Sequence, residues 1–213
     1  MQIYWHGFTC VRIEASYGDK ESTLVTDPYE SNRGLRFPRT LTPDIITLSK
    51  RVEKDFEPGA FPNEPFIIST PGEFEVQGIF VYAIPITQND EKDYGKIMYR
   101  FEVEDITIGF IGEMHRALAE DEVERLGNID ILLIPVGGGN YMTSKQAVET
   151  ISLVEPRMVI PLAHHVSGIK EKLGTADNFC KEIVCQRQDA NKLKIKKKDL
   201  SADELVVTVL ERA

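Results

Sequence analysis

The sequence predicts one layered α/β domain that spans residues 1–213. Short runs of alternating apolar and polar residues fill the first half of the chain, and this pattern is typical of half-buried β-strands. The second half alternates helix-like and strand-like segments, as in βαβ units. No linker rich in Pro, Ser or Gly divides the halves, and 213 residues suffice to bury a core without disulfide staples.

The first half contains a series of short β-prone runs. Alternating apolar residues over 3–13 predict strands on both sides of a break at Gly7. Asp27-Pro28 ends the next strand, and a turn-rich segment at 70–73 separates two later ones. Glu104-Asp105 suits the turn of a hairpin. The further predicted strands cover residues 24–26, 44–48, 66–68, 79–82, 97–103 and 106–111.

Helix-like and strand-like segments alternate from residue 117 onwards. The spacing predicts a helix over 117–126 with an acidic outer face. Thr143 or Ser144 can cap a second helix, whose apolar positions recur every three or four residues until Pro156. A third helix is predicted to begin at Thr175, with Phe179 and Ile183 on its inner face. The predicted strands of this half cover residues 129–136, 158–162 and 205–210.

The net charge argues against a nucleic-acid partner. The chain has 25 Lys and Arg against 34 Asp and Glu, a formal charge of −9, whereas duplex-binding proteins present a positive face. The one basic run lies at 192–198, where Leu193 and Ile195 alternate with lysines. This alternation predicts a half-buried strand with a solvated lysine face.

The cysteines indicate where in the cell the protein is expected, and the apolar runs indicate whether it contacts a membrane. No apolar run approaches the ~20 residues that cross a bilayer, and no signal peptide is visible at 1–14, so we expect no membrane partner. Cys10, Cys180 and Cys185 form neither a CxxC motif nor a cluster with histidine, which predicts no disulfide framework and no structural zinc site. Free thiols and a cytoplasmic location are therefore expected.

Three glycines, Gly137, Gly138 and Gly139, follow the predicted strand at 129–136. Such a run can form a tight turn or cradle a phosphate group. Since the GxGxxG and Walker patterns are both absent, the tight turn is favoured.

Seven segments, spread over nearly the whole chain, share their order with one known family. They read YWHG at 4–7, TDPY at 26–29, DIITLS at 44–49, PGEFEVQG at 71–78, IGE at 111–113, LGNIDILLIPVGGG at 126–139 and PRMVIP at 156–161. In this order they resemble the metallo-β-lactamase superfamily, in particular its branch of small Zn-dependent hydrolases that includes the L-ascorbate-6-phosphate lactonases. The resemblance implies a four-layer αββα sandwich with the active site at one edge, built from loops at strand ends.

The chemistry of that family needs two divalent metals, which activate a bridging water and polarise the scissile bond. Most of the ligands come from an HxHxDH motif directly after the strand that corresponds to 44–49. The resemblance matches the motif's histidines to Lys50, Val52 and Asp55 and its aspartate to Lys54. A lysine ammonium has no lone pair and valine cannot ligate, so only Asp55 offers a donor there.

The remaining ligand positions of the family are altered as well. The bridging aspartate of a Gly-Asp pair matches Glu113, and a histidine three residues earlier matches Phe110. The early histidine matches Phe8, and the last one matches Ala163, with two histidines directly after it. Because the chain has only four histidines, we expect no metal cofactor.

Two of three further polar residues have two interpretations each. In the family, the aspartate at the position of Asp27 orients a metal ligand without contacting the metal itself. Asp27 either has this role or caps the turn before proline. Glu73 can be a ligand or a structural hydrogen-bond acceptor. His6, beside Trp5, is expected to lie in the core or near the surface.

Four further side chains are candidates for the site. Glu113 and His115 share a face if their segment is extended, and there they contact metal or substrate or lie in a polar loop. His164 and His165 either face the cavity or are partly exposed without a metal.

Charge balance predicts what fills the altered site. The loss of two metals would leave Asp27, Glu113 and Asp55 facing one another, and buried like charges are costly. We therefore predict that Lys50 or Lys54 pairs with an acidic residue of the former cavity, with Asp27 and Glu113 as the favoured partners. The rival interpretation is an exposed loop whose charges are solvated.

Together these residues favour a metal-free descendant of a Zn-dependent hydrolase that acts as a ligand-binding or interaction protein. Its partner would be a small molecule or a protein, and a homo-oligomer is compatible with the sequence. The alternative is a hydrolase of an ester, lactone or phosphodiester with a rebuilt mononuclear zinc site. At least three donors would have to converge, drawn from Asp27, Asp55, Glu113, His115, His164 and His165. A nucleic-acid-processing enzyme of the same superfamily is disfavoured by the net charge.

Overall fold

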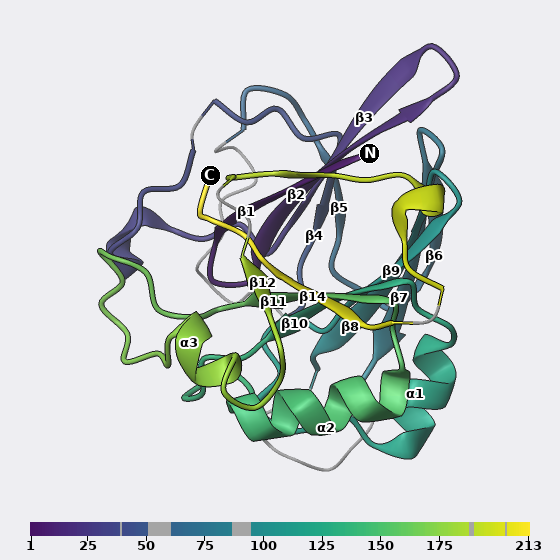
Figure 1. The fold of residues 1–213 in the computed structure, drawn as a ribbon. Helices are drawn as coiled ribbons and strands as arrows, with labels where there is room; N and C mark the ends of the chain where they lie inside the picture. Colours follow the sequence, from purple (N-terminus) through teal and green to yellow (C-terminus); the bar gives the residue numbers. More distant parts are fainter. Residues whose placement is uncertain (39, 51–60, 87–94, 188–189, 203) are drawn as a thin grey trace.

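A six-stranded sheet forms one side of a β-sandwich (Figure 1). The computed structural model describes residues 1–38, 40–50, 61–86, 95–187, 190–202 and 204–213. The strand order is β13-β1-β2-β3-β4-β5, and β3, β4 and β5 run parallel. The strands are β1 (Gln2–Gly7), β2 (Cys10–Tyr17), β3 (Lys20–Thr26), β4 (Ile45–Thr47), β5 (Phe66–Ile68) and β13 (Leu193–Lys194).

An eight-stranded sheet packs against it, in the order β12-β14-β11-β10-β9-β8-β7-β6. Its β6-β7-β8-β9 part is an antiparallel meander, whereas β9, β10, β11 and β14 run parallel. The strands are β6 (Gly72–Val76), β7 (Ile79–Pro85), β8 (Ile97–Val103), β9 (Ile106–Phe110), β10 (Ile131–Pro135), β11 (Met158–Leu162), β12 (Gln186–Arg187) and β14 (Val206–Val209).

The core between the sheets follows from the two-residue period of the strands. Alternate residues of β1 and β2, among them Ile3, Trp5 and Ile13, are buried against Phe101 and Phe110 of the facing sheet. The run over β10 is buried at every position because both faces of that strand are covered. The pair of packed sheets predicted from the family resemblance is thereby confirmed.

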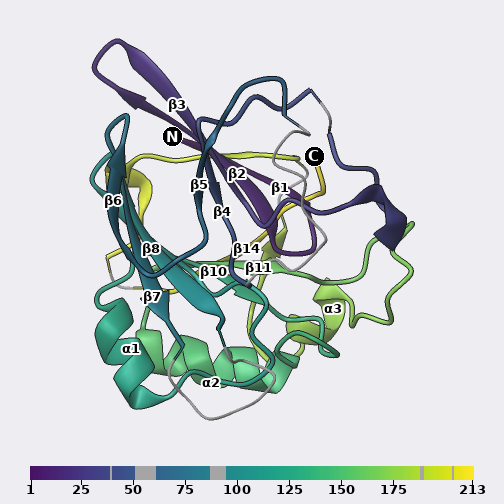
Figure 2. The same ribbon diagram turned by 180° about the vertical axis from the view of Figure 1, so that it is seen from behind.

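Helices cover the outer face of the eight-stranded sheet (Figure 2). They are α1 (Glu120–Leu126), α2 (Ser144–Val154) and the short α3 (Ala176–Phe179). Thr143 caps α2 and accepts a hydrogen bond from the backbone of Gln146, as its residue type predicts. Ala147 and Ile151 of α2 pack with Leu132 and Val159 of the sheet. Within the described ranges, no helix is long and apolar enough to cross a membrane.

The outer face of the six-stranded sheet is covered differently. Cys10, Val25 and Ile46 point to this face and pack against Tyr29 and Leu35. Those two residues belong to the largely irregular segment between β3 and β4, which also contains the 3-10 helix η1 (Ser31–Arg33). A second 3-10 helix, η3 (Lys197–Asp199), lies near the chain's end.

Two local predictions are wrong. The segment at 70–73 is not only a turn, because β6 begins at Gly72, and the reversal to β7 comes instead at Gln77-Gly78. The third helix ends at Phe179, so Ile183 lies outside it.

The prediction of three free thiols is also wrong. Cys180 and Cys185 form a disulfide, with their Cα atoms 5.4 Å apart. The chain reverses directly after α3, and this reversal brings both cysteines within the range that a disulfide bridges. Cys10 is free and buried. The disulfide removes the thiol argument for a reducing compartment.

Candidate functional site

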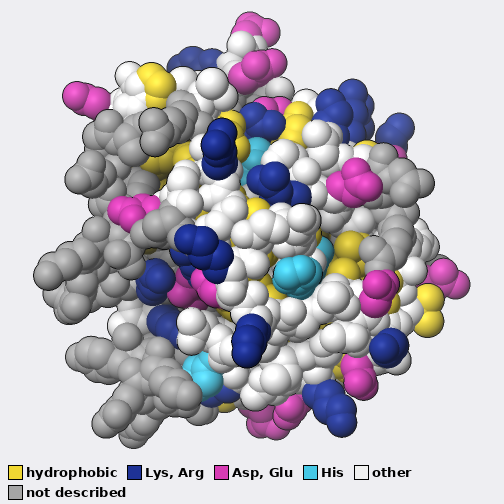
Figure 3. All heavy atoms as spheres, turned by 90° about the vertical axis from the view of Figure 1, so that its left-hand side faces the viewer, with side chains coloured by type: hydrophobic (Ala, Val, Ile, Leu, Met, Phe, Trp, Pro, Cys, Tyr) yellow, Lys and Arg dark blue, Asp and Glu magenta, His cyan; other side chains and the backbone are white. Residues whose placement is uncertain are grey.

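The candidate site lies where parallel strands of both sheets end at one edge of the sandwich. Asp27 follows β3, Ser49 follows β4, Glu113 follows β9 and Ala163 follows β11. Figure 3 shows this edge, where Lys and Arg side chains are interspersed with Asp, Glu and His. Backbone hydrogen bonds join the two sheets here. One of them runs from the Ile97 N–H to the Ser49 carbonyl at 2.8 Å.

Asp27 is held by Ser49. The backbone N–H and the Oγ of Ser49 donate to the two carboxylate oxygens of Asp27, each at 2.6 Å. The backbone N–H of Asp27 in turn donates to the Thr47 carbonyl at 2.9 Å. Asp27 has φ +37°, in the left-handed region that Asp tolerates better than most residues. These hydrogen bonds show that Asp27 holds the end of β3 against the end of β4. The predicted alternative pairing of Lys50 with Asp27 is not observed.

Glu113 is surrounded by cations. Its Oε2 lies 3.2 Å from the Nζ of Lys50, and its Oε1 lies 3.5 Å from a guanidinium nitrogen of Arg33. Lys96 donates to the backbone carbonyl of Glu113. The Glu113 side chain is only 13% exposed. The predicted pairing of Lys50 with Glu113 is therefore confirmed.

The segment that carries Glu113 approaches Ser49 closely. The backbone N–H of Glu113 donates to the Oγ of Ser49 at 3.1 Å. Gly112 has φ +65°, and a Cβ there would lie 2.2 Å from the Cβ of Ser49. Only glycine fits this approach, which explains the glycine directly before Glu113.

Arg33, from η1, is a residue of the site that the sequence analysis missed. Its Nε donates to Glu171 at 2.7 Å, and its Nη2 donates to the Tyr141 hydroxyl at 2.8 Å. Its guanidinium lies 4.0 Å from the centre of the Phe8 ring. Phe8, at the family's early histidine position, thus supports a cation instead of binding a metal.

The buried groups of the site have shifted proton affinities. Burial, and after it the negative charge of Glu113, raises the pKa of Asp27, and the hydrogen bonds from Ser49 oppose both effects; the net pKa is about 6. Burial and the charge of Glu113 also raise the pKa of Tyr141 above its usual value, so this hydroxyl stays protonated.

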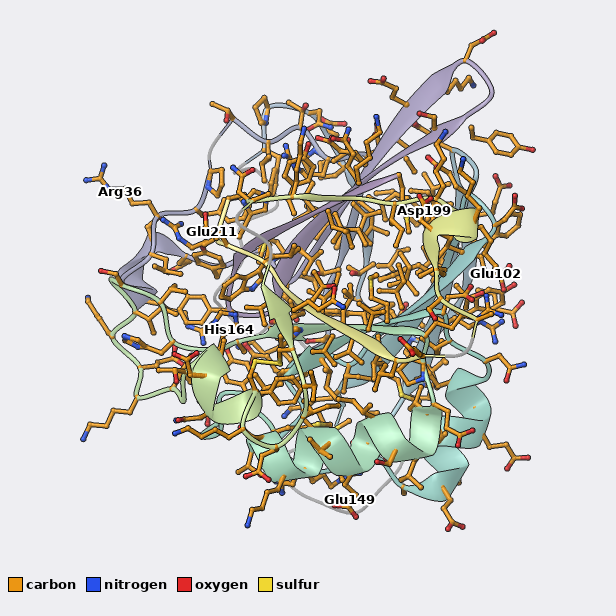
Figure 4. All side chains as sticks on the ribbon, in the orientation of Figure 1. Arg36, Glu102, Glu149, His164, Asp199 and Glu211 are labelled. Carbon is orange, nitrogen blue, oxygen red and sulfur yellow. A yellow bond between two sulfur atoms is a disulfide. The ribbon has the colours of Figure 1, made fainter. Side chains whose placement is uncertain are left out.

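The four histidines do not converge on the site. His164 is buried and packs on Trp5 with ring centres 4.2 Å apart; Figure 4 shows it in the interior near α3. His165 is exposed, and His115 is partly exposed. His6 is buried, and desolvation lowers its pKa to about 4. Across the described ranges, no three His, Cys, Asp or Glu residues are placed to hold one metal.

The glycine run after β10 forms the predicted tight turn. Gly138 and Gly139 have φ values of +74° and +71°. The Gly138 N–H donates to the Met142 carbonyl at 2.8 Å. A Cβ at Gly137 would lie 2.0 Å from the carbonyl oxygen of Ala163, so the strand ends of β10 and β11 pack tightly.

Several predicted residues lie elsewhere. Glu73 is exposed on the edge strand β6, and within the described ranges its carboxylate accepts no hydrogen bond. Val52, Lys54 and Asp55 lie outside the described residues.

Comparison with known proteins agrees with this arrangement of strands and loops. A model of the beta-lactamase superfamily domain matches residues 2–163. The chain belongs to the metallo-β-lactamase superfamily. A candidate Zn-dependent hydrolase of this superfamily from Thermotoga maritima has 26% identity and a TM-score of 0.79, with 99% of this chain and 100% of the other covered. A candidate metal-dependent hydrolase from Parabacteroides distasonis, at 14% identity and a TM-score of 0.62 over 98% and 93% of the chains, shows the shared fold alone.

Two sequence relatives come from archaea. A UPF0173 metal-dependent hydrolase of Pyrococcus horikoshii is 27% identical over 100 residues, which is 44% of each chain. A UPF0173 protein of Pyrococcus abyssi is 31% identical over 61 residues, which is 29% of this chain and 27% of the relative. The matched segments thus span less than half of either archaeal protein.

The metallo-β-lactamase fold implies a metal centre, and the described residues do not fit one. A zinc centre needs lone-pair donors such as imidazole, thiolate or carboxylate. Here the carboxylate of Glu113 is engaged by Lys50 and Arg33, while Ala163 and Phe8 offer no donor atom. The arrangement can hold charged groups in fixed positions, but the residues that the structure describes form no cluster of donors of the kind that a metal requires.

Proposed function

We propose that this chain is a metal-free member of the superfamily that serves as a ligand-binding or interaction protein. The observation that carries the proposal is the Lys50–Glu113 ion pair, with a separation of 3.2 Å. A cationic side chain stands where the resemblance places a metal-binding histidine, and it neutralises the carboxylate that the metals otherwise neutralise. No metal cofactor is needed to balance this charge.

Arg33 supports the same proposal. It links Glu113 to Glu171 and to the Tyr141 hydroxyl, and it is stacked on Phe8. Such a network keeps the loops at the strand ends in place without a metal. Loops fixed at the edge of a sandwich are suited to bind a small molecule or a protein partner.

The proposal departs from the descriptions of the relatives. The Thermotoga and Pyrococcus horikoshii proteins are described as zinc- or metal-dependent hydrolases. Their hydrolytic chemistry requires a metal-activated water. We propose that this chemistry does not extend to the present chain because its donors are replaced.

The alternative, a rebuilt mononuclear site, needs three convergent donors. Glu113 is engaged by cations, His164 packs on Trp5, and His165 is exposed. Asp55 lies outside the described residues. No arrangement among the described side chains favours this alternative over the metal-free proposal.

An activity panel tests the proposal. The full chain is assayed with a nitrophenyl ester, a lactone and a bis-nitrophenyl phosphodiester, each with zinc or manganese supplied. We expect rates at the background of the metal alone, and no difference between the natural chain and Glu113→Gln. Metal-dependent turnover that Glu113→Gln abolishes would favour the hydrolase alternative.

A further inference from the structure

A cleft of about 980 Å³ lies at the end of the sandwich opposite the former metal site. One wall is the β2–β3 hairpin, which projects beyond the body of the sandwich at the upper right of Figure 1. The other walls are the start of the chain, the β8–β9 turn and the segment of Lys194 and Lys196. The cleft shares no residue with the site around Glu113.

Two exposed aromatic rings line the cleft. Tyr17 is 68% exposed and Phe80 is 45% exposed, which is unusual for residues of this size. Tyr17 is nevertheless supported: its ring lies over Gly78, where a Cβ would come within 2.4 Å of it. A supported, solvent-facing ring can receive a cationic side chain on its face.

The charge of the lining is negative. The cations are Lys194, Lys196 and the amino group of Met1, which is paired with Glu104 at 2.5 Å. Among the described residues, the side chains of Glu21 and Asp105 form no ion pair. The five carboxylates of the lining belong to Glu14, Glu21, Glu102, Glu104 and Asp105.

The cleft also contains an open strand edge. β1 pairs with β2 only as far as Gln2 opposite Glu14, whereas β2 and β3 stay paired to Tyr17 opposite Lys20. Residues 15–17 therefore have no strand neighbour on the β1 side. The N–H of Ser16 points to this side and donates to Glu104 at 2.9 Å. An extended peptide can add to the sheet along this edge if it displaces the Glu104 carboxylate from the Ser16 N–H.

We propose that this cleft binds an extended segment of a partner protein that is rich in lysine or arginine. Its volume is at the upper end of the range for small-molecule pockets, and it is open to solvent, which favours a peptide segment over a compact ligand. The segment lies along residues 15–17, and its cationic side chains contact the ring of Tyr17 and the carboxylates of Glu21 and Asp105.

Fluorescence anisotropy with a labelled Arg-Val-Arg-Val-Arg-Val peptide tests the proposal on the full chain. We expect saturable binding, weakened about tenfold by Tyr17→Ala and about tenfold by the pair Glu21→Gln and Asp105→Asn. The matched control is the pair Glu149→Gln and Glu211→Gln, which removes two charges far from the cleft (Figure 4) and is expected to change the affinity less than about twofold.

Three results would overturn the proposal. Equal weakening by the control pair would mean that the net charge of −9 attracts any polycation. Unchanged affinity in Tyr17→Ala would remove the ring from the site. Spermine could displace the labelled peptide at the same concentration at which unlabelled peptide displaces it. That result would mean that the cleft binds free polyamines.

Discussion

The ammonium group of Lys50 lies 3.2 Å from the carboxylate of Glu113, two groups that follow strands of different sheets. Lys50 is 45% exposed, whereas Glu113 is 13% exposed. The pair is therefore half-solvated, and its attraction is moderated by water. Its role is to balance charge at the edge of the sandwich more than to stabilise the fold.

Lys50→Ala should consequently have a small effect on stability. We expect a loss of under about 1 kcal/mol in the free energy of unfolding, because an exposed ion pair contributes little and Arg33 still faces Glu113. Urea unfolding at low and high salt measures it, and the difference should shrink at high salt. A loss of several kcal/mol would show that the pair is buried in solution.

Arg33→Ala should cost much more, about 2–4 kcal/mol. The substitution removes the partner of two carboxylates, Glu113 and Glu171, together with the bond to Tyr141 and the contact with Phe8. Arg36→Ala is the matched control: Arg36 is exposed and extends into solvent in Figure 4, so its loss should stay within about 0.5 kcal/mol. Equal effects of the two substitutions would argue against the Arg33 network.

Asp27→Asn should change the pH dependence of stability. The pKa of Asp27 is raised from 3.8 to about 6 in the folded chain, so the fold favours the protonated carboxyl. This contribution is fully present below pH 4 and is lost as the pH rises through 6. We expect the stability of Asp27→Asn relative to the natural chain to increase by roughly 2–3 kcal/mol between pH 4 and pH 7 and to level off above. A pH-independent difference would contradict the raised pKa.

His6 should destabilise the fold in acid. Its pKa is lowered from 6.5 to about 4, mainly by desolvation, so the unfolded chain binds a proton more readily. Stability from neutral His6 is present above pH 6.5 and is lost as the pH falls towards 4. The free energy of unfolding of His6→Gln, measured between pH 6.5 and pH 4, should not show this loss. The exposed control His165→Gln should lose stability as the natural chain does. If the free energy of unfolding depends on pH in the same way for His6→Gln and for the natural chain, the prediction is contradicted.

The disulfide can be tested by alkylation. Without reductant, the unfolded chain should take up one iodoacetamide, on Cys10, and after reduction it should take up three. Replacement of both Cys180 and Cys185 by serine should cost about 2 kcal/mol at most, because the closed loop is short. Three alkylated cysteines without reductant would show that the bridge does not form in solution.

Regular elements could be predicted from the sequence where periodicity was strong. The hairpin of β8 and β9 and the buried strands β10 and β11 follow from their apolar patterns. β6 was missed because it is an exposed edge strand behind Pro71-Gly72, where turn residues dominate the local signal. The disulfide was missed because it depends on a chain reversal that leaves no periodic pattern.

The candidate site could be predicted only in part. Charge balance predicted the contact of Lys50 with Glu113, because both residues stand at family ligand positions. Arg33 could not be predicted, since it comes from an irregular segment whose path depends on packing against Tyr29 and Leu35. The bond of Asp27 to Ser49 needs the register of β3 with β4, which a sequence does not reveal.

The zinc stoichiometry of the chain, purified without a histidine tag, tests the central claim most directly. The protein is dialysed against a small excess of zinc, freed of loosely held metal by a weak chelator, and measured by elemental analysis. Because Lys50 engages Glu113 and Ala163 offers no donor, we predict well under one zinc per chain. Two tightly held zinc ions per chain would contradict the account and show that this member of the superfamily retains its metal centre.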